Sequence, residues 1–218
     1  MKRVLATCFR EVTFELRRII FYYTEVFPCE VEDYCSSRVP FRHRVALSLA
    51  TGLLFGFAHR FEPLSLHLIL ACIFLFFVEA VAYIDQRHMV IVDEILFPFV
   101  PLGLLHAALS PRPWHEFVSG ALLGYTFFIL IYIFSRGRLG FGDVKYAGVL
   151  GLWLGAPGTV TCIGLAFLTG GCVAAFICLQ GGATAKTKVP FGPYLSLGAV
   201  ISYFYASQIL SWYCSLCL

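Results

Sequence analysis

Long apolar runs, separated by short polar stretches, fill most of the sequence after residue 43. Hydrophobic residues make up 59% of the chain and charged residues 13%, against roughly 45–50% and about 25% in soluble domains. A helix needs about 20 apolar residues to cross a bilayer, so we expect an all-α polytopic membrane protein with about seven transmembrane helices surrounded by lipid. The runs cover residues 44–58, 64–84, 91–109, 117–135, 144–155, 159–180 and 194–213.

The Lys and Arg residues are concentrated on one predicted side of the membrane. Of 16 such residues, all but Arg60 and Arg112 lie in the N-terminal segment or in and beside the loops after the second, fourth and sixth runs. Positively charged loops stay in the cytoplasm, so we expect a cytoplasmic N-terminus and a multi-pass topology. The net charge of +3 is too small to indicate a nucleic-acid partner.

Residues 1–43 form the only long polar region of the chain. Their first apolar stretch has only about six residues before Arg10, whereas a secretory signal needs roughly 7–15. We therefore expect no cleaved signal, but a cytoplasmic N-terminal segment over residues 1–43 and a membrane-embedded domain over residues 44–218.

The nine cysteines do not form a recognisable metal motif. Several lie inside apolar runs, where cysteine behaves as a small hydrophobic residue. Cys214 and Cys217 have a C-x-x-C spacing, but no second pair accompanies them. The histidines show no ligand spacing either, so we expect no metal site.

Two aspartates, Asp85 and Asp143, lie at ends of apolar runs that are both predicted to face the cytoplasm. Helix packing could bring them together although they are far apart in the sequence. Two adjacent carboxyls can share one proton, because neighbouring negative charges repel each other. The ionised group can then take a proton from water while its partner donates one to a carbonyl oxygen. This is the chemistry of aspartic peptide hydrolysis, and it requires no metal.

The residues around Asp143 allow either a catalytic or a structural role. Gly140 and Gly142 let the backbone bend and a substrate strand approach, and the start of a helix favours a negative charge. Asp143 could instead be a helix cap, since Asp is common at the N-cap position. Asp85, likewise, could simply terminate a span.

Other acidic residues lie in or beside the predicted membrane. Glu79 is about six residues inside the second run, where a carboxyl group is costly. It could pair with a neighbouring helix or support the acid site. Asp93 and Glu94 open the third run and are expected at the interface, and Asp93 could also support the acid site.

Four segments resemble, in order, the sequence blocks of the type IV prepilin peptidases, which are integral-membrane aspartic proteases with a G-x-G-D motif. AYIDQRHMVIVDEI (82–95) resembles their I-D-x-x-x-x-x-I-P-D block, and RLGFGDVKYAGVLGLWLG (138–155) resembles their G-x-G-D-x-K block. KVPFGPYLSLGAVIS (188–202) resembles their I-P-F-G-P signature, and SSRVPFRHRVALSLATGLLF (36–55) is a looser likeness to their R-Y-P-x-x-E segment. Four blocks in the same order are specific for this family, whereas a G-x-G-D motif alone is not.

The resemblance implies that Asp85 and Asp143 are the catalytic pair, and that Pro190 and Gly192 shape the mouth of the site. It also implies the substrates, which are prepilin or pseudopilin-like precursors that lose a short basic leader peptide. Cleavage would occur at the cytoplasmic face of the bacterial inner membrane, for type IV pilus or type II secretion assembly. The peptidase activity would need no cofactor.

The sequence departs from the family pattern at three places. The common bacterial form has paired C-x-x-C motifs that bind zinc in a cytoplasmic loop, and residues 1–43 lack these pairs. Those relatives also methylate the new N-terminus, so S-adenosylmethionine would be a cofactor here only if that activity were retained. Val92 replaces the proline of I-P-D, and Arg44 stands near the position of the R-Y-P-x-x-E acid. Both aspartates are kept.

Three alternatives are compatible with parts of this pattern. Another G-x-G-D protease would cut membrane-buried stubs and would not depend on a basic leader. A transporter or channel could use Glu79, Asp85 and Asp143 as ion-binding acids, although we find no internal repeat of the kind common in transporters. A non-catalytic assembly protein could have kept the fold, but it would have no need of both aspartates.

Overall fold

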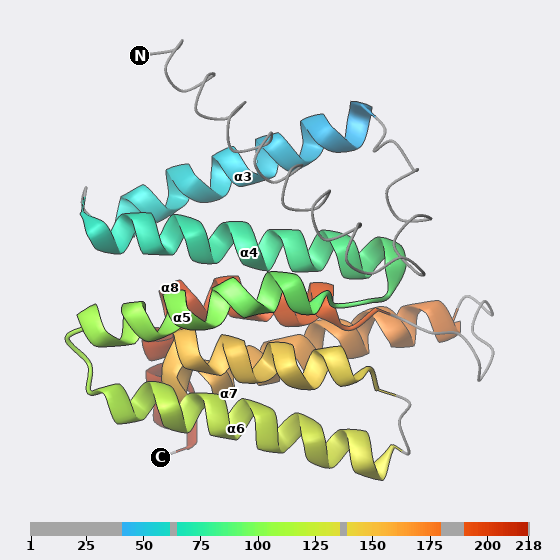
Figure 1. The fold of residues 1–218 in the computed structure, drawn as a ribbon. Helices are drawn as coiled ribbons and strands as arrows, with labels where there is room; N and C mark the ends of the chain where they lie inside the picture. Colours follow the sequence, from blue (N-terminus) through green and yellow to red (C-terminus); the bar gives the residue numbers. More distant parts are fainter. Residues whose placement is uncertain (1–40, 62–64, 136–138, 180–189, 218) are drawn as a thin grey trace. The chain divides into compact units, whose positions relative to one another are not determined.

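The computed structural model describes residues 41–61, 65–135, 139–179 and 190–217, and helix is the only regular structure within these ranges. Residues 50–218 form one compact unit, and both aspartates belong to it. The all-α prediction is therefore confirmed for the described residues. Their helices are α3 (Phe41–Phe61), α4 (Leu66–His88), α5 (Asp93–Leu109), α6 (Trp114–Phe134), α7 (Phe141–Leu179) and α8 (Gly192–Cys217) (Figure 1).

Most predicted apolar runs correspond to one helix each, but the runs 144–155 and 159–180 are both part of α7. Among the described helices, α4, α6 and α7 are long and apolar enough to cross a membrane. The chain is thus a helical membrane protein, whereas the number of seven spans stays a prediction. The proposed domain boundary after residue 43 also stays a prediction, because residues 1–40 lie outside the described residues.

Helix α7 is interrupted at Gly155, whose backbone is not helical (φ 74°, ψ 171°). A positive φ of this kind favours glycine. Arg112, in the connection between α5 and α6, donates a 3.2 Å hydrogen bond from Nη1 to the carbonyl of Leu154. That carbonyl belongs to the end of the first half of α7, where backbone acceptors have no partner within the helix. Pro157 lies in the first turn of the second half, where its missing N–H costs no helical hydrogen bond.

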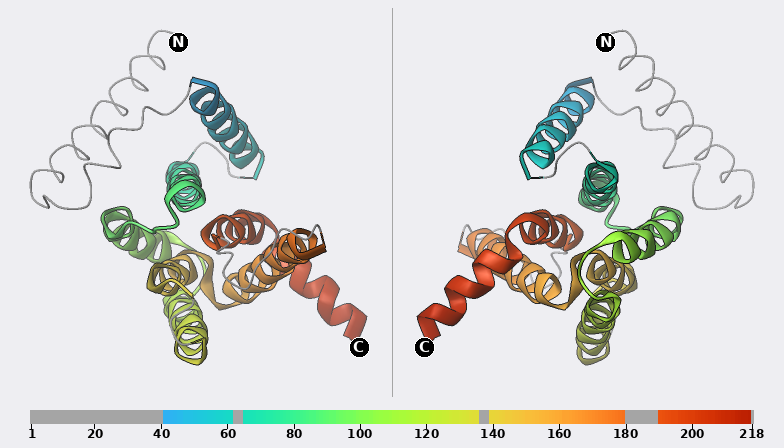
Figure 2. Two further views of the ribbon diagram at one scale, coloured as in Figure 1. Left: turned by 90° about the vertical axis from the view of Figure 1, so that its right-hand side faces the viewer. Right: turned by 90° about the vertical axis from the view of Figure 1, so that its left-hand side faces the viewer.

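The second half of α7 runs back along α8, so that α8 contacts both halves. The first half lies parallel to α8, since Tyr146 contacts Ser196 near the start of both helices, and Trp153 and Tyr203 line one cavity further along. The second half lies antiparallel, since Cys162 contacts Leu195 and Gly170 faces Phe191 and Tyr194. Viewed nearly along the helix axes, α8 lies beside α4 as well as α7 (Figure 2).

Small residues allow α6 and the first half of α7 to pack backbone against backbone. A Cβ atom added at Gly120 would lie 2.5 Å from the carbonyl oxygen of Gly151, and one added at Gly151 would overlap the carbonyl of Gly120. A Cβ atom at Gly124 would overlap the carbonyl of Ala147. Gly120 and Gly124 form a G-x-x-x-G motif, which favours close helix packing in membranes. This readable signal in the sequence was missed.

An aromatic cluster joins α4, α5 and the first half of α7. Phe74, Phe99 and Trp153 are fully buried, and their ring centroids lie 5.1–5.9 Å apart. Trp153 also donates a 3.0 Å hydrogen bond from Nε1 to the carbonyl of Phe99. The cluster fixes α7 against α4, and these are the two helices that carry the aspartates.

Candidate active site

The C-terminal end of α4 and the N-terminal end of α7 lie on the same side of the helical array (Figure 1). Asp85 is in the last turn of α4, and Asp143 is in the first turn of α7. Their exposed fractions are only 5% and 8%, and the two carboxyl groups interact electrostatically with each other. The helices thus bring together two acids that are distant in the sequence, which is the arrangement that acid–base hydrolysis needs.

A backbone donor from α8 binds Asp85. The N–H of Gly192 donates a 2.8 Å hydrogen bond to Asp85 Oδ2. Gly192 is the first residue of α8, where backbone N–H groups have no partner within the helix and the helix end carries partial positive charge. A Cβ atom at position 192 would lie 2.6 Å from the same oxygen. Glycine is therefore required here by the close approach of the carboxylate.

Asp143 is the third residue of α7 and is therefore not its N-cap residue. Its backbone N–H donates to the carbonyl of Gly140 at 3.2 Å. A Cβ atom at Gly140 would lie 3.1 Å from Asp143 Oδ2, so glycine leaves room for this side chain. The other oxygen, Oδ1, is buried and has no hydrogen-bond partner among the described residues. One oxygen of this buried acid thus has an unused hydrogen-bonding position among the described residues.

The connection between α4 and α5 packs on the first turn of α7. Met89 has a left-handed backbone (φ 55°, ψ 36°) and ends α4. Ile91 then reaches Gly142, where an added Cβ atom would lie 2.9 Å from Ile91 Cβ. The space beside Gly142 is therefore occupied by Ile91. The approach of a substrate strand to Gly140 and Gly142 stays a prediction. Lys145 Nζ and Asp93 Oδ2 form an exposed ion pair at 2.6 Å in the same region.

Pro190 and Gly192, the predicted site-shaping residues of the last motif, lie on either side of Phe191 at the start of α8. Phe191 provides the first backbone acceptor of the helix, because its carbonyl accepts hydrogen bonds from the N–H groups of Tyr194 and Leu195 at 3.1 Å. Gly192 reaches Asp85 directly, as described above. Pro190 is half-buried and precedes the helix. The motif therefore sets where α8 begins, and through Gly192 it forms part of the acid site.

Glu79 pairs with a neighbouring helix. Thr51 of α3 donates a 2.5 Å hydrogen bond to Glu79 Oε2. The other oxygen, Oε1, is buried and has no partner among the described residues. Of the two roles considered for Glu79, the contact with a neighbouring helix is the one observed.

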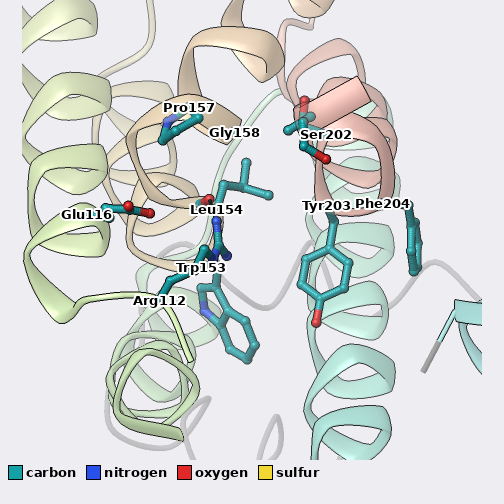
Figure 3. A pocket seen from close by; sticks show the side chains of 11 residues that line it. Arg112, Glu116, Trp153, Leu154, Pro157, Gly158, Ser202, Tyr203 and Phe204 are labelled. Atoms are coloured by element: carbon teal, nitrogen blue, oxygen red, sulfur yellow. Dashed lines mark hydrogen bonds between the residues drawn. The ribbon is translucent and has the colours of Figure 1, made fainter. Parts of the chain in front are cut away.

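A cavity of about 330 Å³ lies at the interruption of α7 and does not include the acid site (Figure 3). Arg112 and Leu154, which form the hydrogen bond at this interruption, both contribute to its wall. Gly155 follows Asp143 by 12 residues, which is about 18 Å along a helix. None of the predicted site residues lines this cavity, whose wall also includes Glu116, Trp153, Pro157, Gly158, Ser202, Tyr203 and Phe204.

Two features of the candidate site were not foreseen. Tyr146 is fully buried one turn from Asp143 and forms a hydrogen bond with Ser196 of α8, but an aromatic residue inside an apolar run gives no sequence signal for this. The contact between Ile91 and Gly142 depends on tertiary packing. No group of three or more His, Cys, Asp or Glu residues that could hold a metal ion occurs in the described part of the chain.

The sequence profile of the type IV leader peptidase family matches residues 70–175, a range that includes both aspartates. The chain is 30% identical over 185 residues to a prepilin leader peptidase/N-methyltransferase of Bacillus subtilis, covering 84% of this chain and 74% of that protein. Proteins of the same name from Xanthomonas campestris and Legionella pneumophila are 26% and 28% identical, over 67% and 82% of this chain. The chain spans only 52% and 62% of those two relatives.

No solved structure matches the chain. The match to the Bacillus protein covers most of both chains, and the family profile covers the segments that carry the two aspartates. This chain therefore belongs to the type IV leader peptidase family.

Proposed function

We propose that this chain is a membrane aspartic endopeptidase that removes the short basic leader from prepilin or pseudopilin-like precursors. It crosses the bacterial inner membrane several times, cuts at the cytoplasmic face, and supplies type IV pilus or type II secretion assembly. One observation carries the proposal: Asp85 and Asp143 are buried on separate helices and interact electrostatically. The family membership and the names of the relatives support the same reaction.

The contacts of the two carboxyls suggest different roles for them. Asp85 accepts the Gly192 N–H at the start of α8, and a donor at a helix N-terminus stabilises an ionised carboxylate. Asp143 has one oxygen without a donor among the described residues. We assign Asp85 as the general base and Asp143 as the general acid.

In this mechanism, Asp85 removes a proton from a water molecule, whose oxygen bonds to the scissile carbonyl carbon. Asp143 gives its proton to the carbonyl oxygen, so the tetrahedral intermediate carries no net charge. The intermediate then collapses. The C–N bond breaks, the leaving amine takes the proton held by Asp85, and Asp143 recovers its proton from the hydroxyl.

We assign no methyl transfer to this chain. The names of the relatives include an N-methyltransferase activity, but the paired C-x-x-C motifs of the bifunctional form are absent from residues 1–43. S-adenosylmethionine therefore enters the test as a reagent, and a mass increase of one methyl group on the product would reveal the second activity.

The test is incubation of the purified full chain with a prepilin peptide and S-adenosylmethionine, followed by mass spectrometry of the products. We expect cleavage by the wild type and none by Asp85→Asn or Asp143→Asn. Glu94→Gln serves as the matched control, because Glu94 is an exposed acid in the same region. Cleavage by either aspartate variant would reject the assignment, provided that the variant protein is purified with the yield and elution profile of the wild type.

A second substrate distinguishes this function from that of another G-x-G-D protease. The basic residues of the leader are replaced by neutral ones, while the cleavage position and the apolar stem are kept. We expect the neutral leader to be cut more slowly, because an acidic site attracts a basic peptide. Equal cleavage of both peptides would favour a protease that recognises the membrane stem.

A further inference from the structure

We propose that Tyr146 and Ser196 form a positioning pair, which holds α8 in the register where Gly192 reaches Asp85. This inference rests on the proposed peptidase function. Tyr146 Oη and Ser196 Oγ lie 2.8 Å apart and form a hydrogen bond between α7 and α8. Neither residue belongs to the predicted site.

The spacing along each helix places this hydrogen bond directly behind the acid site. Tyr146 follows Asp143 by three residues, and Ser196 follows Gly192 by four. Residues with these separations lie on the same face of a helix, one turn apart, or about 5 Å along the axis. The positioning pair therefore links α7 and α8 one turn deeper than the acids. A shift of either helix along its axis would break the pair and move Gly192 away from Asp85.

Burial makes the two hydroxyl groups dependent on each other. Tyr146 is fully buried and Ser196 is 3% exposed, so water cannot replace the hydrogen bond if one partner is lost. Tyr146 lies one turn from Asp143 on α7, and Ser196 lies one turn from Gly192 on α8. Loss of their hydrogen bond should therefore disturb the positions of both Asp143 and the Gly192 donor.

A separate contact holds α8 against the second half of α7. Cys162 Sγ donates a 3.4 Å hydrogen bond to the carbonyl of Leu195, and a Cβ atom at Gly198 would lie 2.5 Å from the carbonyl oxygen of Cys162. These contacts do not involve the positioning pair. Loss of one hydroxyl should therefore leave α8 packed in the protein while relaxing its register against the first half of α7.

The experiment is a double-mutant cycle with Tyr146→Phe and Ser196→Ala, measured as kcat and KM for a prepilin peptide. Each substitution removes one hydroxyl group and little volume. We expect each single variant to lower kcat about tenfold, because small misplacements of catalytic groups are costly. KM should stay within about twofold, and the double variant should be no slower than either single one, because both changes break the same bond.

Two matched controls remove buried hydroxyl groups that have no partner among the described residues. Tyr83→Phe is the control for Tyr146→Phe, and Ser202→Ala, also on α8, is the control for Ser196→Ala. Both controls should keep the wild-type kcat. Additive losses in the double variant, or losses in the controls equal to those of the pair, would overturn the inference.

A readout that does not require cleavage separates this inference from the proposed function. The full chain is treated with a water-soluble carbodiimide, and labelling of Asp85 is followed by peptide mass spectrometry. We expect faster labelling in both positioning-pair variants, since Asp85 loses its Gly192 donor, and wild-type rates in the controls. An unchanged rate in the variants would overturn the inference. A wild-type chain that cuts no prepilin would reject the proposed function, whatever the labelling result.

Discussion

The backbone N–H of Gly192 donates a 2.8 Å hydrogen bond to Asp85 Oδ2, and so joins the first residue of α8 to the last turn of α4. The two residues are 107 positions apart in the sequence. Asp143 lies at the start of a third helix and interacts electrostatically with the same carboxyl. The candidate site is thus made of three helix ends, and its geometry depends on how closely these ends can approach one another.

Replacement of Gly192 by alanine tests the closest of these approaches. The added Cβ atom would lie 2.6 Å from Asp85 Oδ2, so either the carboxylate or the start of α8 must move. We expect Gly192→Ala to lower kcat for prepilin cleavage by about 100-fold, because a displacement near 1 Å can cost that much. Gly164→Ala is the control, since a Cβ atom there meets nothing within 4 Å. Wild-type turnover by Gly192→Ala would contradict the role given to this contact.

Replacement of Gly142 by alanine tests the contact between α7 and the α4–α5 connection. The new Cβ atom would lie 2.9 Å from Ile91 Cβ, and the resulting shift would be transmitted to Asp143, the next residue. We expect Gly142→Ala to lower kcat and Ile91→Gly, combined with it, to restore part of the loss. Gly56→Ala, in open space on α3, should behave as the wild type. Failure of the double variant to recover any activity would argue against this contact.

The sequence predicted the elements of the site better than their contacts. Asp85 and Asp143 could be recognised because acids at the ends of apolar runs are unusual, and α4 follows its apolar run closely. The interruption of α7 at Gly155 was indicated only by the short run 144–155 and the gap before the run 159–180. The side chain that fills the space at Gly142 could not be predicted, because Ile91 reaches it only through the left-handed turn at Met89.

The hydrogen bond between Tyr146 and Ser196 is another contact that could not be predicted from the sequence. A tyrosine and a serine inside apolar helices carry no pattern that assigns them to each other, since the pairing depends on the register of α8 against α7. The glycine motif at 120–124 was, by contrast, readable from sequence, because small residues spaced by four favour close packing of membrane helices.

The exposed ion pair of Asp93 and Lys145 is expected to contribute little to stability. The two atoms are 2.6 Å apart, but the side chains are 63% and 39% exposed, and exposed pairs typically contribute about 0.2–1 kcal/mol. Asp93→Asn and Lys145→Gln should each lower the free energy of unfolding by less than about 1 kcal/mol, with a smaller effect at high salt. Chemical unfolding in detergent at two salt concentrations measures this. A larger, salt-independent loss would indicate that the pair is a structural part of the site.

The backbone contact between α6 and α7 gives two predictions of opposite sign within one helix. A Cβ atom at Gly151 would overlap the carbonyl of Gly120, so Gly151→Ala must separate the helices, and we expect a loss of about 1–3 kcal/mol from overpacking. At Gly171, also in α7, a Cβ atom meets nothing within 4 Å. Gly171→Ala should therefore keep or raise stability by up to about 1 kcal/mol, since alanine favours helix over glycine. Thermal unfolding of both variants in the same detergent compares them directly, and equal midpoints would show that α6 and α7 do not depend on this contact.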